Sequence, residues 1–334
     1  MKRLLALTLG IALGAFLIYF TLPKEPTEKP TPEKEERLEL LFVGDIMPSR
    51  YVAKAMREHG YDFPFQHIAT TTRSASIAFG NLESPVLPGA IVRAGEMRFR
   101  TDPEFLPYLR DAGFDIVSLA NNHAYDHGQS GITKTIEALR NNDISFAGVG
   151  IGDEAYRPTY ITRGSTTIAF IAQNDPAPVS PHSCATNSNL GTACFNTAKL
   201  QTALEEASRN ADFTVFTMHA GKEYTSLPEQ KQIDIARFAV DHGADLVVGH
   251  HPHVIQSREY YNGKWIYYSL GNFIFDQSWS RNTTLGLMLR IEISAQSHEV
   301  LALHHNIVKI EEFARPRFAD EEDIAERFSL LDLP

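Results

Sequence analysis

Five apolar stretches of the sequence are each followed by polar side chains of the kinds that bind divalent metal ions. They are Asp45, then Asn81 with Glu83, then Asn122 with His123, then His219, and last His251 with His253. Carboxylate, amide oxygen and imidazole groups together suit borderline ions such as Zn, Mn or Fe. A lone histidine after a strand is more often a structural residue than a ligand. Five such positions along one chain favour a metal site.

These side chains meet only if the apolar stretches form one system of strands. Short apolar stretches predict strands at 38–43, 77–79, 116–119, 145–149, 167–172, 213–218 and 246–248. Helical periodicity predicts helices between them at 134–140 and 230–241. The alternation indicates an α/β fold, in which ligands bind beyond the carboxyl ends of the strands. Further strands are predicted at 265–268, 284–293 and 300–310, with a final helix at 320–330.

The N-terminus carries the pattern of a membrane anchor. Lys2 and Arg3 precede an uncharged, apolar run at 4–23, and about 20 such residues span the hydrocarbon of a bilayer as a helix. No Ala-x-Ala pattern ends the run, which favours an uncleaved signal anchor at 1–23 over a cleaved signal peptide. Basic residues before the span predict a cytoplasmic N-terminus. We therefore expect a single-pass cell-membrane protein that contacts the lipid bilayer through this helix, with an extracytoplasmic (periplasmic or extracellular) domain.

The remaining chain divides by composition into a linker, a domain and a tail. Residues 24–37 are rich in Pro, Glu and Lys and predict a solvated spacer. The folded domain is predicted at 38–315, and a C-terminal helix or tail at 316–334. Cys184 and Cys194 lie in a stretch typical of a loop. In an oxidising compartment they are expected to form a disulfide, the alternative being two free thiols.

The charge of the chain limits its partners. The protein has 334 residues with 41 acidic against 31 basic, a formal net charge of -10. A chain this acidic lacks the basic footprint of a nucleic-acid-binding protein, so no nucleic acid is expected as a partner. It also repels a long anionic polymer unless metal ions or a local basic patch reverse the sign nearby.

The motifs around the metal-type residues resemble a known superfamily. They read GDIMPSR at 44–50, NLESP at 81–85, NNHAYDHG at 121–128, HAGKEY at 219–224, GADLVVGHHPHV at 243–254 and YSLGNFIFD at 268–276. Their order is similar to that of the calcineurin-like metallophosphoesterases, and more specifically to their CapA branch (poly-γ-glutamate capsule synthesis, PGA_cap domain). The resemblance covers about residues 38–280. It implies a four-layer αββα sandwich of two mixed sheets with a metal site at one edge.

The resemblance also implies a role for each matching residue. The metal ligands would be Asp45, Glu83, Asn122, His219, His251 and His253, holding two divalent ions (Mn, Zn or Fe). His123 would act as a general acid oriented by Asp126, while Arg50 and Lys222 would contact an anionic group. Asp126 also fits a turn residue, and Arg50 a plain salt bridge. Asp276 is a further candidate beside the site.

Two motifs depart from the usual metallophosphoesterase pattern. Met47 stands where the opening Asp-x-His motif has its histidine, and a Gly-Asp carboxylate is replaced by the NLE sequence at 81–83. Two functions therefore remain open in capsule or exopolymer biosynthesis. One is a metal-dependent hydrolase that acts on a phosphoester, or on an amide or ester bond of an anionic polymer. The other is a non-catalytic subunit of a membrane synthase complex that binds the polymer during export. A structural surface protein with a vestigial site is a third reading.

Overall fold

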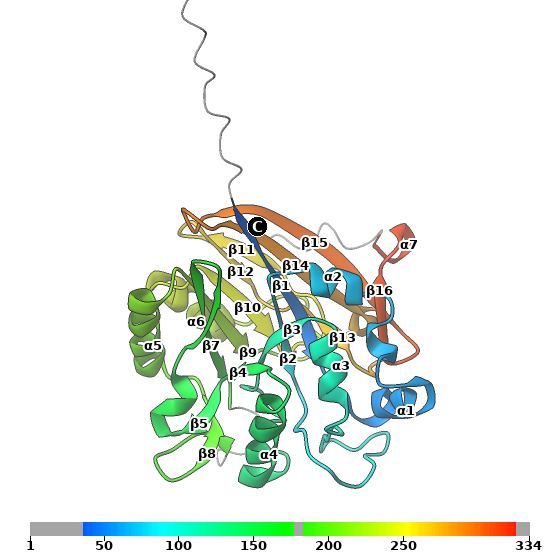
Figure 1. Ribbon diagram of the computed structural model, residues 1–334. Coiled ribbons are helices and arrows are strands. Elements are labelled where there is room, and N and C mark those ends of the chain that lie inside the picture. Colours follow the sequence, from blue (N-terminus) through cyan, green and yellow to red (C-terminus); the bar gives the residue numbers. More distant parts are fainter. Residues whose placement is uncertain (1–35, 177–182, 325–334) are drawn as a thin grey trace, which may run out of the picture. The chain divides into compact units, whose positions relative to one another are not determined.

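Two β-sheets lie face to face, with helices on both outer sides, in the computed structural model, which describes residues 36–176 and 183–324 (Figure 1). The first sheet has the strand order β16 (Arg315–Phe318), β15 (Val300–Glu311), β14 (Leu285–Ser294), β1 (Arg37–Ile46), β2 (Ile77–Leu82), β3 (Phe114–Ser118) and β4 (Ser145–Ala147). A further strand, β13 (Asn272–Ile274), pairs with β1 in parallel. Strands β1 to β4 are parallel, whereas β14 to β16 are antiparallel, so the sheet is mixed.

The second sheet is also mixed. Its order is β11 (Arg258–Tyr261), β12 (Lys264–Tyr267), β10 (Leu246–His250), β9 (Phe213–His219), β7 (Thr166–Asn174) and β6 (Thr159–Arg163). The four central strands are parallel and the two outer ones antiparallel to their neighbours. A separate small pair joins β5 (Val149–Ile151) to β8 (Leu190–Thr192).

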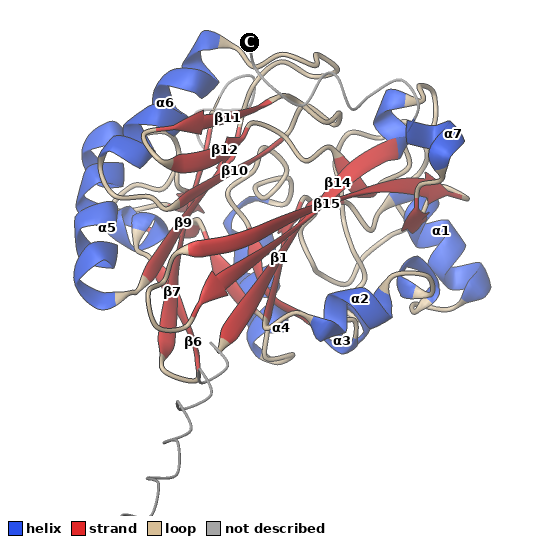
Figure 2. Cartoon of the chain, turned by 90° about the horizontal axis from the view of Figure 1, so that it is seen from above, coloured by secondary structure: helices blue, strands red, loops and turns tan. Residues whose placement is uncertain are grey.

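Helices cover the outer face of each sheet (Figure 2). The first sheet is covered by α1 (Arg50–His59), α2 (Ala69–Ser74), α3 (Phe105–Asp111) and α4 (Gly128–Arg140). The second is covered by α5 (Thr197–Asn210) and α6 (Gln230–Asp241). A short α7 (Glu321–Ile324) follows β16, and 3₁₀ helices lie at Phe63–Phe65, Gly152–Tyr156 and Asn282–Thr284.

Three apolar cores hold these layers together, and strand β1 shows how one strand serves two of them. Its Leu40 and Phe42 belong to the core between the sheets, while Leu41 and Val43 belong to the core under the helices. Successive side chains of a strand point to opposite faces. Because both faces of these sheets are covered, the parallel strands read as continuous apolar runs, which is why the sequence predicted them well.

The two main helices of the second sheet begin at clear capping residues. The Asn196 side chain accepts a hydrogen bond from Lys199 N at 3.0 Å, so the first turn of α5 is capped. Glu229 and Gln232 form a reciprocal capping box at the start of α6. The predicted helix at 230–241 has the bounds of α6, whereas the sequence analysis did not identify α5.

Several sequence-based boundaries differ from the structure. The strand expected at 145–149 is wrong as one element: Gly148, at φ +92°, separates β4 from β5, a conformation that glycine alone adopts readily. Residues 315–318, placed between domain and tail by the sequence, form β16 of the first sheet. Of the helix expected at 320–330, the described part is α7, and the rest lies outside the described residues.

Two predictions from the sequence, the membrane anchor and the disulfide, concern the cellular compartment of the protein. The anchor predicted at 1–23 and nearly all of the linker lie outside the described residues; β1 begins at Arg37. Among residues 36–176 and 183–324, no helix has the length and apolar character needed to cross a bilayer. Cys184 and Cys194 are joined in a disulfide, as the sequence predicted.

Candidate metal centre

The predicted ligands gather where the carboxyl ends of parallel strands from both sheets meet. In the first sheet, β1 and β2 are in a register that pairs Asp45 with Asn81, and Glu83 follows β2 directly. In the second sheet, His219 at the end of β9 pairs with His250 at the end of β10. The first sheet thus supplies carboxylates and the second supplies imidazoles. A bound ion would therefore contact both sheets.

Three of the six predicted ligands form a tight buried group. One ligand atom each from Asp45, Glu83 and His219 lie within 4.8 Å of one another. The carboxylates of Asp45 and Glu83 are fully buried, and His219 is nearly so. Buried carboxylates are normally paired or bound to a metal ion, so this group has the chemistry of a metal site.

The other three predicted ligands join this group by direct contacts. Asn122 Oδ1 lies 2.8 Å from His219 Nε2. The His251 ring centroid is 4.7 Å from that of His219. His253 Nδ1 lies 3.4 Å from Asp45 Oδ2, and its Nε2 lies 3.9 Å from Glu83 Oε1. All six residues are thus brought together.

Buried polar atoms without partners show that the site fits a cation. Glu83 Oε1 and His251 Nδ1 have no hydrogen-bond partner among the described residues, whereas His250 Nδ1 lies 3.4 Å from Asp45 Oδ1. An unsatisfied buried polar group costs roughly 1–3 kcal/mol. A divalent ion held by Asp45, Glu83 and the imidazoles would satisfy the carboxylate and ring nitrogens that face it. The residues present therefore fit a metal ion.

In the metal-free group, the electrostatics favour the metal-binding forms of Asp45 and the imidazoles, but they favour the neutral acid form of Glu83. Burial and the charge of Asp45 raise the pKa of Glu83 well above its usual value. Burial alone would raise the pKa of Asp45 too, but the imidazoles of His250 and His253 hold it well below its usual value. Burial and the neighbouring His251 lower the pKa of His219, and burial with His253 lowers that of His251 to about 4. These imidazoles are neutral at neutral pH, the form that coordinates metals.

Two asparagines connect the ligands: Asn81, which the sequence placed among the metal-type side chains without a ligand role, and Asn121, which was not predicted as a site residue. Asn81 Nδ2 donates to Asp45 Oδ1 at 2.8 Å and to Glu83 Oε2 at 3.3 Å. Asn121 Nδ2 in turn donates to Asn81 Oδ1 at 3.1 Å. Both lie inside the recognised motifs, so their place in the sequence was the available signal. Asn81 orients the carboxylates of Asp45 and Glu83, and Asn121 orients Asn81; both side chains are neutral, so neither adds negative charge to the site.

His123 faces the same group from the first sheet. Its Nδ1 lies 3.0 Å from Asp126 Oδ2, while its Nε2 lies 3.9 Å from Glu83 Oε1. A carboxylate only accepts hydrogen bonds, so Nδ1 carries the proton and Nε2 is turned toward the site. Asp126 is itself held, because Phe99 N donates to its Oδ2 at 2.6 Å. The Phe99 ring stacks on His123 at 3.9 Å between centroids.

Arg50, predicted to contact an anion, forms an ion pair across the mouth of the site. Its Nε donates to Asp276 Oδ2 at 3.1 Å, and its Nη2 bonds Asp276 Oδ1. The guanidinium also lies 4.7 Å from the centre of the Phe99 ring. Lys222 is exposed and does not line the cavity at the mouth. Met47, at the position of the missing histidine, packs in the apolar core under the helices and supplies no ligand.

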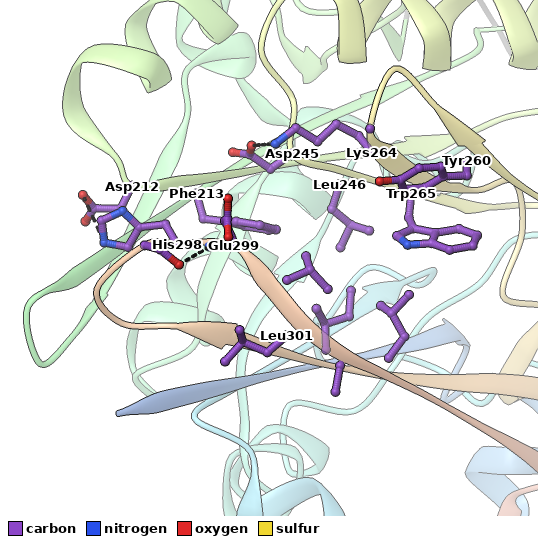
Figure 3. A pocket seen from close by; sticks show the side chains of 16 residues that line it. Asp212, Phe213, Asp245, Leu246, Tyr260, Lys264, Trp265, His298, Glu299 and Leu301 are labelled. Carbon is purple, nitrogen blue, oxygen red and sulfur yellow. Dashed lines mark hydrogen bonds and ion pairs between the residues drawn. The ribbon is translucent and has the colours of Figure 1, made fainter. Parts of the chain in front are cut away.

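A cavity of about 600 Å³ lies at the amino ends of β9 and β10, away from the predicted metal ligands (Figure 3). Asp212 and Phe213 precede and begin β9, and Asp245 and Leu246 precede and begin β10, whereas His219 and His250 end these strands. Lys264 Nζ reaches Asp245 Oδ1 at 2.6 Å on its rim. The cavity is lined by none of the predicted metal ligands. Cavity size alone would therefore have pointed away from the chemistry.

Comparisons with known proteins agree with these motifs. The family model for the bacterial capsule synthesis protein PGA_cap matches residues 39–277. The PGA biosynthesis protein CapA of Bacillus subtilis is 36% identical over 270 residues, covering 79% of this chain and 70% of that protein. The capsule biosynthesis protein CapA of Bacillus anthracis is 34% identical over 277 residues, covering 78% of this chain and 66% of that protein.

Solved structures support the fold. A calcineurin-like phosphoesterase of Bacillus subtilis superimposes with a TM-score of 0.52 at 14% identity, covering 87% of this chain and 95% of that chain. At this identity the likeness concerns the fold alone. The α/β fold with two mixed sheets therefore resembles that of calcineurin-like phosphoesterases.

Proposed function

The chain belongs to the PGA_cap family of bacterial capsule synthesis proteins, and from that premise we propose that it is a metal-dependent hydrolase of the phosphoesterase type. It would act in the biosynthesis of a capsule or related exopolymer such as poly-γ-glutamate. One observation carries the proposal: six metal-type ligands from two sheets gather in one group, in which the buried Glu83 Oε1 has no hydrogen-bond partner among the described residues. We further propose that the site holds two divalent ions.

Each residue at the site has a part in this hydrolysis. Asp45, Glu83, Asn122 and the three histidines would hold the ions. Bound ions would neutralise charge that develops on the ester oxygens and make water a better nucleophile. Water would attack the phosphorus, and the bond from phosphorus to the leaving oxygen would break. Protonated His123 would give its Nε2 proton to that oxygen, since Asp126 holds Nδ1.

The location of the protein is part of the same proposal. The basic residues before the apolar run at 4–23 support a single membrane anchor with the domain outside. The disulfide between Cys184 and Cys194 supports an oxidising compartment. We propose that the domain acts outside the cytoplasm, beside a membrane synthase complex.

A second function is favoured by one observation. Because Met47 packs in the core, the site has one imidazole fewer than the usual metallophosphoesterase pattern. A site weakened in this way would suit a subunit that binds an anionic polymer without cleaving it.

Metal content and hydrolysis measured together test both functions. We compare wild type, Asp45→Asn and His123→Asn, with His242→Asn as a control because His242 contacts Phe238 at the end of α6. We expect Asp45→Asn to lose metal. His123→Asn should keep metal but lower kcat on phenyl phosphate, whose leaving oxygen needs a proton, by about 10²–10⁴-fold, while His242→Asn behaves as wild type.

Two outcomes would contradict the proposal that the protein is a hydrolase. One is a protein that binds no metal after incubation with Mn or Zn. The other is a metal-loaded protein that hydrolyses no phosphoester and no poly-γ-glutamate. Binding of poly-γ-glutamate without turnover would support the polymer-binding function instead.

A further inference from the structure

A small cavity forms the mouth of the metal centre. It has a volume of about 270 Å³, close to the lower limit for small-molecule sites. Its floor includes His123 and His253, and its walls come from Arg50, Phe275, Tyr224 and Trp279 among others. A substrate whose reacting group lies at the ligands would therefore place its next chemical unit in this cavity.

The charge of this cavity does not suit a chain of carboxylates. Arg50 is the one Lys or Arg side chain among its lining residues. Both carboxylate oxygens of Asp276 already bond that guanidinium. Glu223 adds a further negative charge to the lining. A polyanion would find no unpaired cation in these walls, whereas a neutral group would meet no repulsion.

The walls instead present aromatic faces. Trp279 is 63% exposed and Tyr224 is 43% exposed. Their rings meet edge to face, with centroids 4.6 Å apart and planes at 83°. The Tyr224 ring also lies over that of His253, 6.0 Å away and tilted by 30°. Large aromatic side chains clustered at a surface cavity mark a binding site more often than scattered single ones do.

Tyr224 is held in place by its surroundings. Its backbone has φ +64°, in the left-handed region that a tyrosine rarely adopts. Its N–H donates to Pro252 O at 2.8 Å, and its hydroxyl accepts a hydrogen bond from Gln277 Nε2 at 3.2 Å. Strained residues persist where the surrounding structure fixes them, often at functional sites. The ring is thus oriented before any ligand arrives.

We propose that Trp279 and Tyr224 form a stacking subsite for a ring of the substrate, next to the group that is hydrolysed. The substrate class would be a phosphoester whose neighbouring unit is an uncharged aryl or glycosyl ring. This inference rests on the proposed function for the position of the phosphoester, but the ring subsite itself needs only the geometry of the mouth. The shared chemistry of the two ring types is an apolar face, formed by the π electrons of an aryl ring or by the C–H groups of a glycosyl ring.

Binding measured at Trp279 tests the subsite. The sequence contains two tryptophans, so a Trp265→Phe background leaves Trp279 as the only fluorescent one. The probes for the metal-loaded, full-length protein are phenylphosphonate, a glucosyl phosphonate and ethylphosphonate, whose carbon–phosphorus bonds the proposed hydrolysis does not cleave. We expect a ring-bearing probe to quench Trp279 and to bind about three- to ten-fold tighter than ethylphosphonate. By calorimetry, Trp279→Ala should remove that preference and Trp279→Phe should keep most of it.

Each outcome has a distinct meaning. Tighter binding of phenylphosphonate than of the glucosyl phosphonate would assign an aryl ring, and the reverse order a glycosyl ring. Equal binding of all three probes, no binding of either ring-bearing probe, or a ring preference that survives Trp279→Ala would overturn the inference. If the protein binds ring-bearing probes more tightly but hydrolyses no phosphoester, the proposed hydrolase function is refuted and the stacking subsite is not. Hydrolysis without a ring preference would refute the subsite alone.

Discussion

The environment of Glu83 is unfavourable in the metal-free protein and would become favourable if a cation were bound. Its carboxyl group is fully buried, faces the charge of Asp45, and leaves Oε1 without a partner among the described residues. Burial and Asp45 raise its pKa well above 4.5. A residue selected for packing alone would not carry this cost.

This cost predicts a stabilising substitution. Because the pKa of Glu83 is higher in the folded than in the unfolded chain, its stabilising effect is complete below about pH 4.5 and is lost as the pH rises through the folded value. In metal-free protein we expect Glu83→Gln to raise the free energy of unfolding by roughly 1–3 kcal/mol at pH 8 and little at pH 4.5. Urea denaturation with EDTA at both pH values measures this.

A control variant shows whether the gain in stability is specific to Glu83 or follows from any Glu→Gln substitution. Glu259 is also partly buried, but both of its carboxylate oxygens accept hydrogen bonds from Arg237, so Glu259→Gln should give no gain. Glu83→Gln should also lose the stabilisation by added metal that wild type shows. A Glu83→Gln protein less stable than wild type at every pH would mean that Glu83 serves the fold instead.

At the scale of elements, strand β10 and the turn after it deliver three histidines to the site. The turn needs left-handed backbone at two of them, with φ +99° at His251 and +58° at His253. At the strand end, Gly249 allows the backbone of Tyr268 to approach closely: a Cβ there would lie 2.0 Å from Tyr268 O. The close approach holds the end of β10, and with it the position of the ligand turn.

Adding one methyl group at this strand end should therefore damage the site. We expect Gly249→Ala to lower the free energy of unfolding by about 2–4 kcal/mol and to reduce bound metal, because a backbone atom must move. Gly164 is the control: it has φ +59° and its nearest neighbour to a new Cβ is a side-chain atom at 3.9 Å. Gly164→Ala should cost about 1 kcal/mol and leave the metal content unchanged. Equal stability and metal content in both variants would contradict this account.

At the scale of the whole molecule, the candidate metal centre lies where the two sheets meet. Asp45, Glu83 and Asn122 come from the first sheet, and His219, His251 and His253 from the second. The sheets also contact through the apolar core between them. An ion at this edge would link the sheets, so its binding should stabilise the fold as a unit.

Metal removal should then lower the stability of the whole domain. Each ten-fold rise in free metal above its dissociation constant adds about 1.4 kcal/mol to the free energy of unfolding per bound ion. Two ions should give about twice that slope. Denaturation at buffered Mn or Zn concentrations, with EDTA as the zero point, measures both the effect and the number of ions. A flat profile in wild type, matching that of Asp45→Asn, would exclude a structural link through metal.

The sequence by itself determined the ligand types, their order and the strands that carry them. The apolar runs that became β1, β2, β9 and β10 were recognisable because both faces of these strands are buried. The metal-type residues at their ends were recognisable because the carboxyl edge of parallel strands is where ligands bind. These signals are local, since they depend on side-chain type and on positions a few residues apart.

The tertiary structure alone decided which of these side chains face one another and what surrounds them. Arg50 and Asp276, which pair at the mouth, are 226 residues apart in sequence. Trp279 and Tyr224 meet across the same cavity, Met47 turns into the core, and Glu83 Oε1 is left unpaired. None of these follows from local periodicity, because each depends on how the two sheets pack and on which strand ends that packing brings together.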